Sequence, residues 1–206
     1  MEILTIQHLN CHIGYASGFA DTPRRHIVMA TKFKNVALFG ANGQLGQAIL
    51  NSLVANKQQN FNIVASIAPG TSKPMNADHS NVTVKSCDIF HKHALSDILK
   101  DADVVISALN GKALEAQGAL QDVAADVGVK RFIPSEYGMH HIYRRPGDPK
   151  GYVHELWDLK QRQNELAVRH PAIKAGKMSY TLIGCGDFYN QARVSITQPP
   201  SSRIVY

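Results

Sequence analysis

From Lys34 onward, short apolar runs alternate with segments whose apolar residues recur at helical spacing, and this alternation limits the possible fold most strongly. Parallel strands need a crossover between them, which is usually a helix, so such alternation is typical of a parallel sheet. We predict strands at 36–39, 61–67, 82–84, 104–108, 131–133 and 180–183, and helices at 44–55, 94–100, 113–127 and 156–168. Six strands with intervening helices predict an α/β fold with a doubly wound parallel sheet of the Rossmann type.

The 206 residues are enough for one domain of this kind. Hydrophobic residues make up 44% and charged residues 18%, which provides material for a packed core and excludes a wholly disordered chain. Residues 1–33 show no sustained period. We therefore expect a poorly ordered N-terminal extension over residues 1–33 and a single domain over residues 34–206.

Composition also excludes several classes of protein. The three cysteines are widely spaced, which argues against a disulfide framework and a structural zinc site. No apolar run approaches the roughly 20 residues of a membrane span, and the start lacks the layout of a secretory signal. We expect a cytoplasmic protein that binds no membrane. The net charge of +6 comes mainly from residues after 130, spread without interleaved aromatics, so a solvated basic face or an anionic ligand is favoured over nucleic acid.

Residues 40–46, Gly-Ala-Asn-Gly-Gln-Leu-Gly, follow a predicted strand and open a predicted helix, which is the context of a dinucleotide-binding loop. The first glycine allows a tight turn, the second lets a pyrophosphate approach the backbone, and the third lets helix and strand pack closely. The free amides of the helix N-terminus attract phosphate. The predicted cofactor-binding residues are Gly40, Asn42, Gly43, Gln44, Leu45 and Gly46. The alternative is a tight loop without a ligand.

The residues after the second strand bear on the choice between NADP and NAD. NAD-binding folds usually place an acid there for the ribose hydroxyl, but this chain has no Asp or Glu between Gly40 and Asp78. Lys73 lies in the same stretch and would attract a 2′-phosphate, so we predict NADP; the alternative is an ordinary loop lysine. Asp88, beyond the third strand, is a candidate for binding adenine, or a turn residue.

Three motifs resemble a known family: 36–46 (VALFGANGQLG), 103–108 (DVVISA) and, most specifically, 130–138 (KRFIPSEYG). They are similar to the NmrA-like, isoflavone-reductase-like branch of the atypical short-chain dehydrogenases, over about residues 34–190. The resemblance implies a Rossmann domain that binds NADPH and reduces a small aromatic or phenolic substrate. It adds Ala108 and Ser135 to the expected cofactor-binding residues, and it places Tyr137 near the substrate.

The resemblance also implies a catalytic lysine on the helix after the Pro-Ser-Glu-aromatic-Gly segment, and Lys160 stands there. A lysine in a partly dry site can transfer a proton or polarise a substrate oxygen; the alternative is a solvent-facing helix lysine. This chain departs from the pattern in three ways. Leu156 occupies the place of the usual proton-donating tyrosine, residues 67–69 lack the arginine expected for the 2′-phosphate, and the chain ends at Tyr206, so we expect a truncated substrate lobe.

Three functions are therefore open: an NADPH-dependent reductase, a non-catalytic redox-sensing regulator that binds NAD(P), and an inactive truncated paralogue. We expect a monomer or a homodimer. The histidines at 8, 12, 91, 93, 140 and 141 lack partners at metal-ligand spacing, so no metal is expected. Cys185 follows the sixth strand at the ligand-binding edge, and no neighbouring residue in the sequence indicates a reactive thiol.

Overall fold

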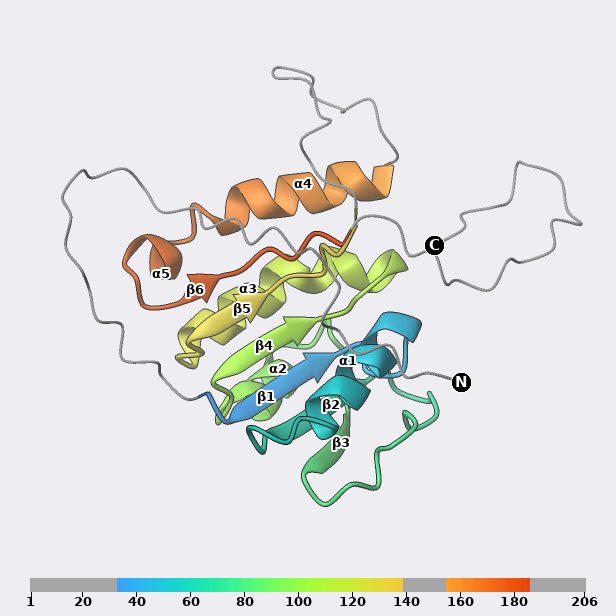
Figure 1. Ribbon diagram of the computed structural model, residues 1–206. Helices are drawn as coiled ribbons and strands as arrows, with labels where there is room; N and C mark the ends of the chain where they lie inside the picture. The colour runs from blue at the N-terminus through green and yellow to red at the C-terminus, as the bar shows by residue number, and fades with distance from the viewer. Residues whose placement is uncertain (1–32, 139–154, 186–206) are drawn as a thin grey trace, which may run out of the picture.

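The structure, a computed structural model, describes residues 33–138 and 155–185 (Figure 1). The strands are β1 (Asn35–Phe39), β2 (Asn62–Ile67), β3 (Val82–Ser86), β4 (Val104–Ser107), β5 (Arg131–Ile133) and β6 (Ser179–Tyr180). The helices are α1 (Gln44–Val54), α2 (Lys92–Leu99), the 3-10 helix η2 (Gly111–Ala116), α3 (Gln117–Asp126), α4 (Glu155–Ala167) and α5 (Pro171–Lys174). The expected extension lies outside the described residues, apart from Phe33.

All six strands form one sheet in the order β3-β2-β1-β4-β5-β6, and every neighbouring pair is parallel (Figure 1). This is the strand order of a doubly wound Rossmann sheet, so the predicted fold class is confirmed. The chain reverses its direction of winding between β3 and β4, which places β1 and β4 side by side. Ligands of such sheets bind at the carboxyl ends of the strands beside this switch point.

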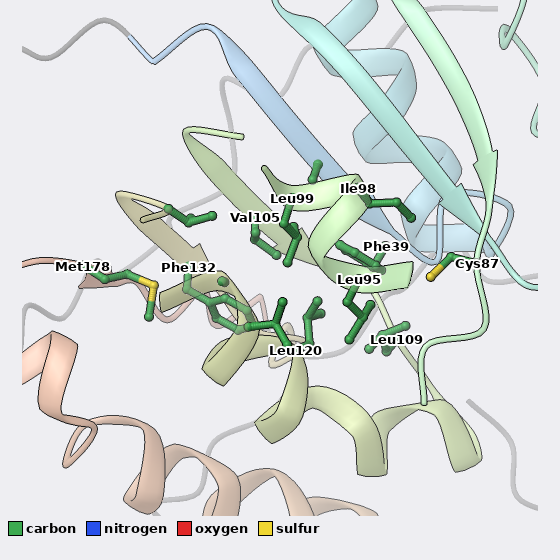
Figure 2. Packing of buried hydrophobic residues seen from close by; sticks show 14 of the residues in the cluster. Phe39, Cys87, Leu95, Ile98, Leu99, Val105, Leu109, Leu120, Phe132 and Met178 are labelled. Carbon is green, nitrogen blue, oxygen red and sulfur yellow. The ribbon is translucent and has the colours of Figure 1, made fainter. Parts of the chain in front are cut away.

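The residues of β1 alternate between two hydrophobic clusters, because successive side chains of a strand point to opposite faces. Val36 and Leu38 pack in the cluster that includes Leu50 of α1. Ala37 and Phe39 pack in the second cluster, with apolar side chains of α2 and α3. Figure 2 shows this second cluster, in which the labelled helix residues are Leu95, Ile98, Leu99 and Leu120 and the labelled strand residues are Phe39, Val105 and Phe132. Both faces are thus buried, which fixes the register of the sheet.

Most predicted elements differ from the observed ones by one or two residues at an end, the short helix α5 was not predicted, and two elements differ more. The sixth strand was expected at 180–183, but β6 ends at Tyr180. Its partner β5 stops at Ile133 because Pro134 has no amide hydrogen to continue the ladder. The helix expected at 113–127 is divided into η2 and α3, a distinction that apolar spacing does not resolve. Among the described helices, none has the length and apolarity needed to span a membrane.

Candidate functional site

The glycine-rich loop is packed so tightly that two of its glycines cannot carry a side chain. Gly40 has a φ of +77°, and a Cβ there would lie 2.9 Å from the carbonyl carbon of Ala108. A Cβ on Gly46 would lie 2.7 Å from the carbonyl carbon of Gly40. The turn off β1 and the close approach of α1 to β1 therefore both require glycine. Ala108, at the end of β4, forms the opposite wall of the loop.

The N-terminus of α1, reached through residues 40–46, is open to an anion; we name this segment the α1 mouth. Gly43 is the N-cap residue, with an extended backbone, and no side chain caps this end of the helix. The first turn contains no acidic residue, and Asn42, Gly43 and Gln44 are exposed. Uncapped amides and the positive end of the helix dipole form a site for phosphate. The absence of a capping or acidic side chain at this helix start suits a diphosphate, such as that of a nicotinamide dinucleotide.

Gln47 of α1 holds the loop that follows β2. Its side-chain oxygen accepts a hydrogen bond from the Met75 amide at 2.7 Å, and its side-chain nitrogen donates to the Met75 carbonyl, also at 2.7 Å. Asn51, one turn later on α1, accepts a hydrogen bond from Asn76 at 2.9 Å. The loop is thus held against α1 at two points, Gln47 and Asn51. Lys73 precedes the Met75 contact by two residues and is exposed.

Asp88 makes a turn after β3. Its carboxylate accepts a hydrogen bond from the Phe90 amide at 3.0 Å and lies 3.8 Å from the His91 imidazole. The side chain is half-exposed, at 49%. These contacts are those of a turn residue, and they leave room for a further donor on the same carboxylate.

A buried network of polar side chains joins β4, α3, β5 and α4. The Gln117 side-chain oxygen accepts hydrogen bonds from the Ser107 hydroxyl at 2.9 Å and from the Ser135 amide at 2.7 Å. The Gln117 nitrogen donates to the Gln163 side chain at 3.1 Å. The Ser135 hydroxyl itself donates to the Leu109 carbonyl at 2.6 Å. Ser135 is buried, and its hydroxyl fixes the segment after β5 to the segment after β4.

Lys160 lies in a second polar group, which we name the β5–α4 corner: Glu136, Lys160, Asn164 and Tyr180. The Lys160 ammonium donates to the Glu136 carbonyl at 2.7 Å. Asn164 donates to the Glu136 carboxylate at 2.7 Å and accepts a hydrogen bond from the Tyr180 hydroxyl, also at 2.7 Å. Burial lowers the pKa of Lys160, and the nearby Glu136 charge partly opposes this effect. Lys160 is partly buried and held in place, unlike a lysine that simply faces solvent.

Tyr137 has a strained backbone in the same segment. Its φ is +48°, which is uncommon for a residue with a side chain, and the residue is buried. Its hydroxyl has no hydrogen-bond partner among the described residues. Burial raises the pKa of this phenol, with the nearby Cys185 as a second cause, so it stays protonated.

The structure brings some of the predicted site residues together, whereas Lys73 and Asp88 lie in the separate loops after β2 and β3. The α1 mouth and Ala108 meet at one point, while Ser135 and Lys160 follow β5 at the same carboxyl edge of the sheet. Sequence reasoning missed the polar residues Gln47, Gln117, Gln163, Asn164 and Tyr180. The available signal was a polar residue on a helix at a core position, such as Gln117 in α3. His140 and His141 lie outside the described residues, and within the described ranges no group of three or more potential ligands could hold a metal.

Comparison with known proteins agrees with this arrangement. The chain is 32% identical to asnovolin J 5′,6′-dehydrogenase of Aspergillus novofumigatus over 160 residues, which cover 76% of this chain and 45% of that protein. It is 27% identical to a probable pinoresinol-lariciresinol reductase of Arabidopsis thaliana over 169 residues, covering 82% of this chain and 52% of that protein. The chain thus spans about half the length of these relatives.

Solved structures share the fold. The structure of AtPrR2 with NADP+ and (+)-pinoresinol matches with a TM-score of 0.52 at 22% identity, over 72% of this chain and 48% of that one. A short-chain dehydrogenase from Veillonella parvula in complex with NADP matches with a TM-score of 0.50 at 17% identity, over 73% and 68%. The model of the NmrA-like family matches residues 32–199, which include the whole of the sheet and the site described above. On this match, the chain belongs to the NmrA-like family.

Proposed function

We propose that the protein is an NADPH-dependent reductase of a small aromatic or phenolic substrate. The observation that carries the proposal is the α1 mouth. It is an uncapped helix N-terminus next to Gly40 and Gly46, where the packing leaves no room for a Cβ, and it lies at the same edge of the sheet as Lys160. Two further points support it. Relatives are named as pinoresinol-lariciresinol reductase and isoflavone reductase homologue, and a structural neighbour was solved with NADP+ and pinoresinol.

The α1 mouth would hold the diphosphate through backbone amides at the start of the helix, while the Gly43 amide itself donates to the Gly40 carbonyl at 3.0 Å. The residues that would line the diphosphate are Gly40, Asn42, Gly43, Gln44, Leu45 and Gly46. Ala108 and Ser135 would border the cofactor further along the sheet edge, and Asp88 would accept a hydrogen bond from adenine. When bound, NADPH supplies a hydride to a carbon of the substrate. The absence of acidic side chains in the first turn of α1 removes repulsion of its phosphates.

Lys73 favours NADP over NAD in this proposal. The loop from 68 to 77 contains no acidic residue, so a 2′-phosphate meets one cation and no anion there. Gln47 fixes this loop on α1 through the Met75 backbone. The fixed loop reduces the entropy that Lys73 would lose on binding a phosphate, compared with a free loop.

Lys160 would hold the proton that a reduced substrate oxygen or carbon needs. Its Nζ has three hydrogens, one of which is donated to the Glu136 carbonyl, and the others remain for the substrate. Because burial lowers its pKa, the ammonium loses a proton more readily than an exposed lysine. If the ammonium is the acid, turnover falls as pH rises through this lowered pKa. The alkaline limb of the rate profile should therefore lie below the usual range of a lysine.

The direct test is NADPH consumption with pinoresinol and with an isoflavone as probe substrates. Replacement of Lys160 by Ala should lower turnover by about 10²- to 10⁴-fold, the usual contribution of acid–base catalysis. NADPH affinity, measured by calorimetry, should change little. Replacement of the exposed Lys130 by Ala is the matched control and should leave both quantities unchanged. Equal turnover in wild type and Lys160→Ala would remove Lys160 from the catalytic role.

A second candidate function is a regulator that binds NAD(P) without turnover. It is favoured by Leu156, which stands where a proton-donating tyrosine would, and by the Lys160 contact with a main-chain carbonyl. A regulator would bind NADPH and NADP+ with different affinities and consume neither with any probe substrate. NADPH consumption by the wild type, lost in Lys160→Ala, decides for the reductase.

A further inference from the structure

Glu136 and Lys160 form an unusual pair, because the lysine contacts the backbone of the residue whose carboxylate is buried beside it. Glu136 is 3% exposed, and its carboxylate accepts a hydrogen bond from Asn164 at 2.7 Å. Lys160 and Asn164 are one helical turn apart on α4, so both reach the same residue from the same face. A carboxylate buried this deeply is costly unless hydrogen bonds and a positive charge compensate it.

The Tyr180 hydroxyl orients this arrangement from β6. It donates to the Asn164 side-chain oxygen at 2.7 Å, which turns the Asn164 nitrogen toward Glu136. The Tyr180 ring stacks on Phe132 of β5, with centroids 6.0 Å apart, so the hydroxyl is held by the packing of the core. Three elements therefore converge on one carboxylate: α4, β6 and the segment after β5.

We propose that Glu136 is a positioning residue in two ways: its backbone carbonyl keeps Lys160 in place, and its carboxylate, oriented by Asn164 and Tyr180, sets how readily the Lys160 ammonium gives up a proton. The effect of Glu136 on catalysis rests on the proposed function of Lys160. The effect of Glu136 on the Lys160 ammonium can be measured on the protein without cofactor. Burial and the Glu136 charge act on Lys160 in opposite directions, so removing the charge should leave burial as the larger influence.

Within residues 33–138 and 155–185, the other charged and titratable groups near this corner have the following contacts. On α4 itself, Asp158 pairs with Arg162 at 2.6 Å, and Glu165 accepts a hydrogen bond from Gln161 at 2.8 Å. On α3, Asp122 lies 3.3 Å from His170. Burial raises the pKa of both Tyr180 and Tyr137, which are therefore neutral, and Cys185 acts on Tyr137.

Replacement of Glu136 by Gln tests the proposal, because it keeps the shape and an acceptor for Asn164 while removing the charge. The backbone carbonyl that binds Lys160 is unaffected. The readout is the pH dependence of Lys160 acetylation, measured site by site by mass spectrometry on the full chain without cofactor. We expect the midpoint for Lys160 to move to lower pH, and its acetylation near neutral pH to become roughly three- to tenfold faster. Exposed Lys130 serves as the internal reference.

Two further variants make the result specific. Replacement of Tyr180 by Phe keeps the ring stack and removes the hydroxyl, and should move the Lys160 midpoint in the same direction by a smaller amount. It also tests the proposal should Glu136→Gln fail to fold. Replacement of Glu115 by Gln makes the same chemical change at an exposed position and should move nothing.

An unchanged or raised Lys160 midpoint in folded Glu136→Gln overturns the proposal, as does an unchanged midpoint in folded Tyr180→Phe where Glu136→Gln does not fold. Failure of the proposed function has a different signature. In that case the wild type would not bind or consume NADPH, while the midpoint shift in Glu136→Gln would still be observed.

Discussion

The α1 mouth and the β5–α4 corner lie at the same edge of the sheet, but they are built from different parts of the chain. The mouth uses backbone: three glycines, an uncapped helix N-terminus and no charged side chain in the first turn. The corner uses side chains: a buried carboxylate, an ammonium, an amide and a phenol from three elements. The first region presents amides to any anion of the right shape, whereas the second holds one particular group in one position.

This difference determines how each region should respond to mutation. A backbone site is sensitive to added volume and nearly indifferent to the chemistry of the residue removed. A side-chain site tolerates small changes of volume but is sensitive to the loss of a single hydrogen-bonding atom, because a buried partner is then left unsatisfied. Each mutation below separates these two behaviours.

Replacement of Gly46 by Ala should have the largest effect, because it lowers the stability of the fold and also abolishes NADPH binding. Ala is normally the better helix residue, but its Cβ would overlap the Gly40 carbonyl, so the loop or helix must shift. We expect a loss of about 1–3 kcal/mol or more in the free energy of unfolding, as for overpacked cores, and loss of NADPH binding. The same substitution at Gly118 of α3, where nothing lies within 4 Å, should instead stabilise by about 0.5–1 kcal/mol. Thermal unfolding of both variants is the measurement; a stabilising Gly46→Ala contradicts the packing described for the loop.

Replacement of Gln117 by Leu tests the polar network that supports the corner. It removes the acceptor of the Ser107 hydroxyl and the Ser135 amide, all three groups being buried. Each unsatisfied group costs about 1–3 kcal/mol, so for the two groups we expect a loss of roughly 2–6 kcal/mol in the free energy of unfolding, measured in urea. Gln121→Leu, on the same helix, loses only one bond of 3.4 Å to the Ala167 carbonyl and is the control. Equal losses in the free energy of unfolding of the two variants would show that the hydrogen bonds of Gln117 add nothing to the stability of the fold.

Replacement of Lys73 by Glu should have the smallest effect, because the side chain is exposed. Near a 2′-phosphate, the reversed charge should weaken NADPH binding by roughly tenfold and leave NADH binding unchanged. Lys57→Glu, an exposed residue in the turn after α1, is the control and should affect neither. Parallel calorimetric titrations with the two cofactors measure the difference. Equal weakening of both would mean that Lys73 does not distinguish NADP from NAD.

The sequence was sufficient for the sheet and the α1 mouth, because both follow from local patterns. Alternating apolar runs define the strands, and the glycine spacing at 40, 43 and 46 defines the turn at one point in the chain. The corner could not be derived in the same way. Tyr180 and Glu136 are 44 positions apart, and only the parallel pairing of β5 with β6 brings them to one place. The contact of Gln47 with the Met75 backbone is likewise invisible in the sequence, since any residue other than proline at position 75 would supply both the amide and the carbonyl.

Calorimetric titration of wild type and Gly43→Val with NADPH tests the central claim, that the α1 mouth binds a dinucleotide. Gly43 has an extended backbone that a β-branched residue can adopt, and its Cβ would meet only the Gly40 carbonyl oxygen, at 3.3 Å. The Gly40 carbonyl must give way by a few tenths of an ångström, so the melting temperature of the variant is measured beside its affinity to confirm that the variant is folded. We expect saturable binding of one NADPH by the wild type and at least a hundredfold weaker binding by Gly43→Val. Absence of binding by the folded wild type, or equal affinity in the variant, would contradict the account.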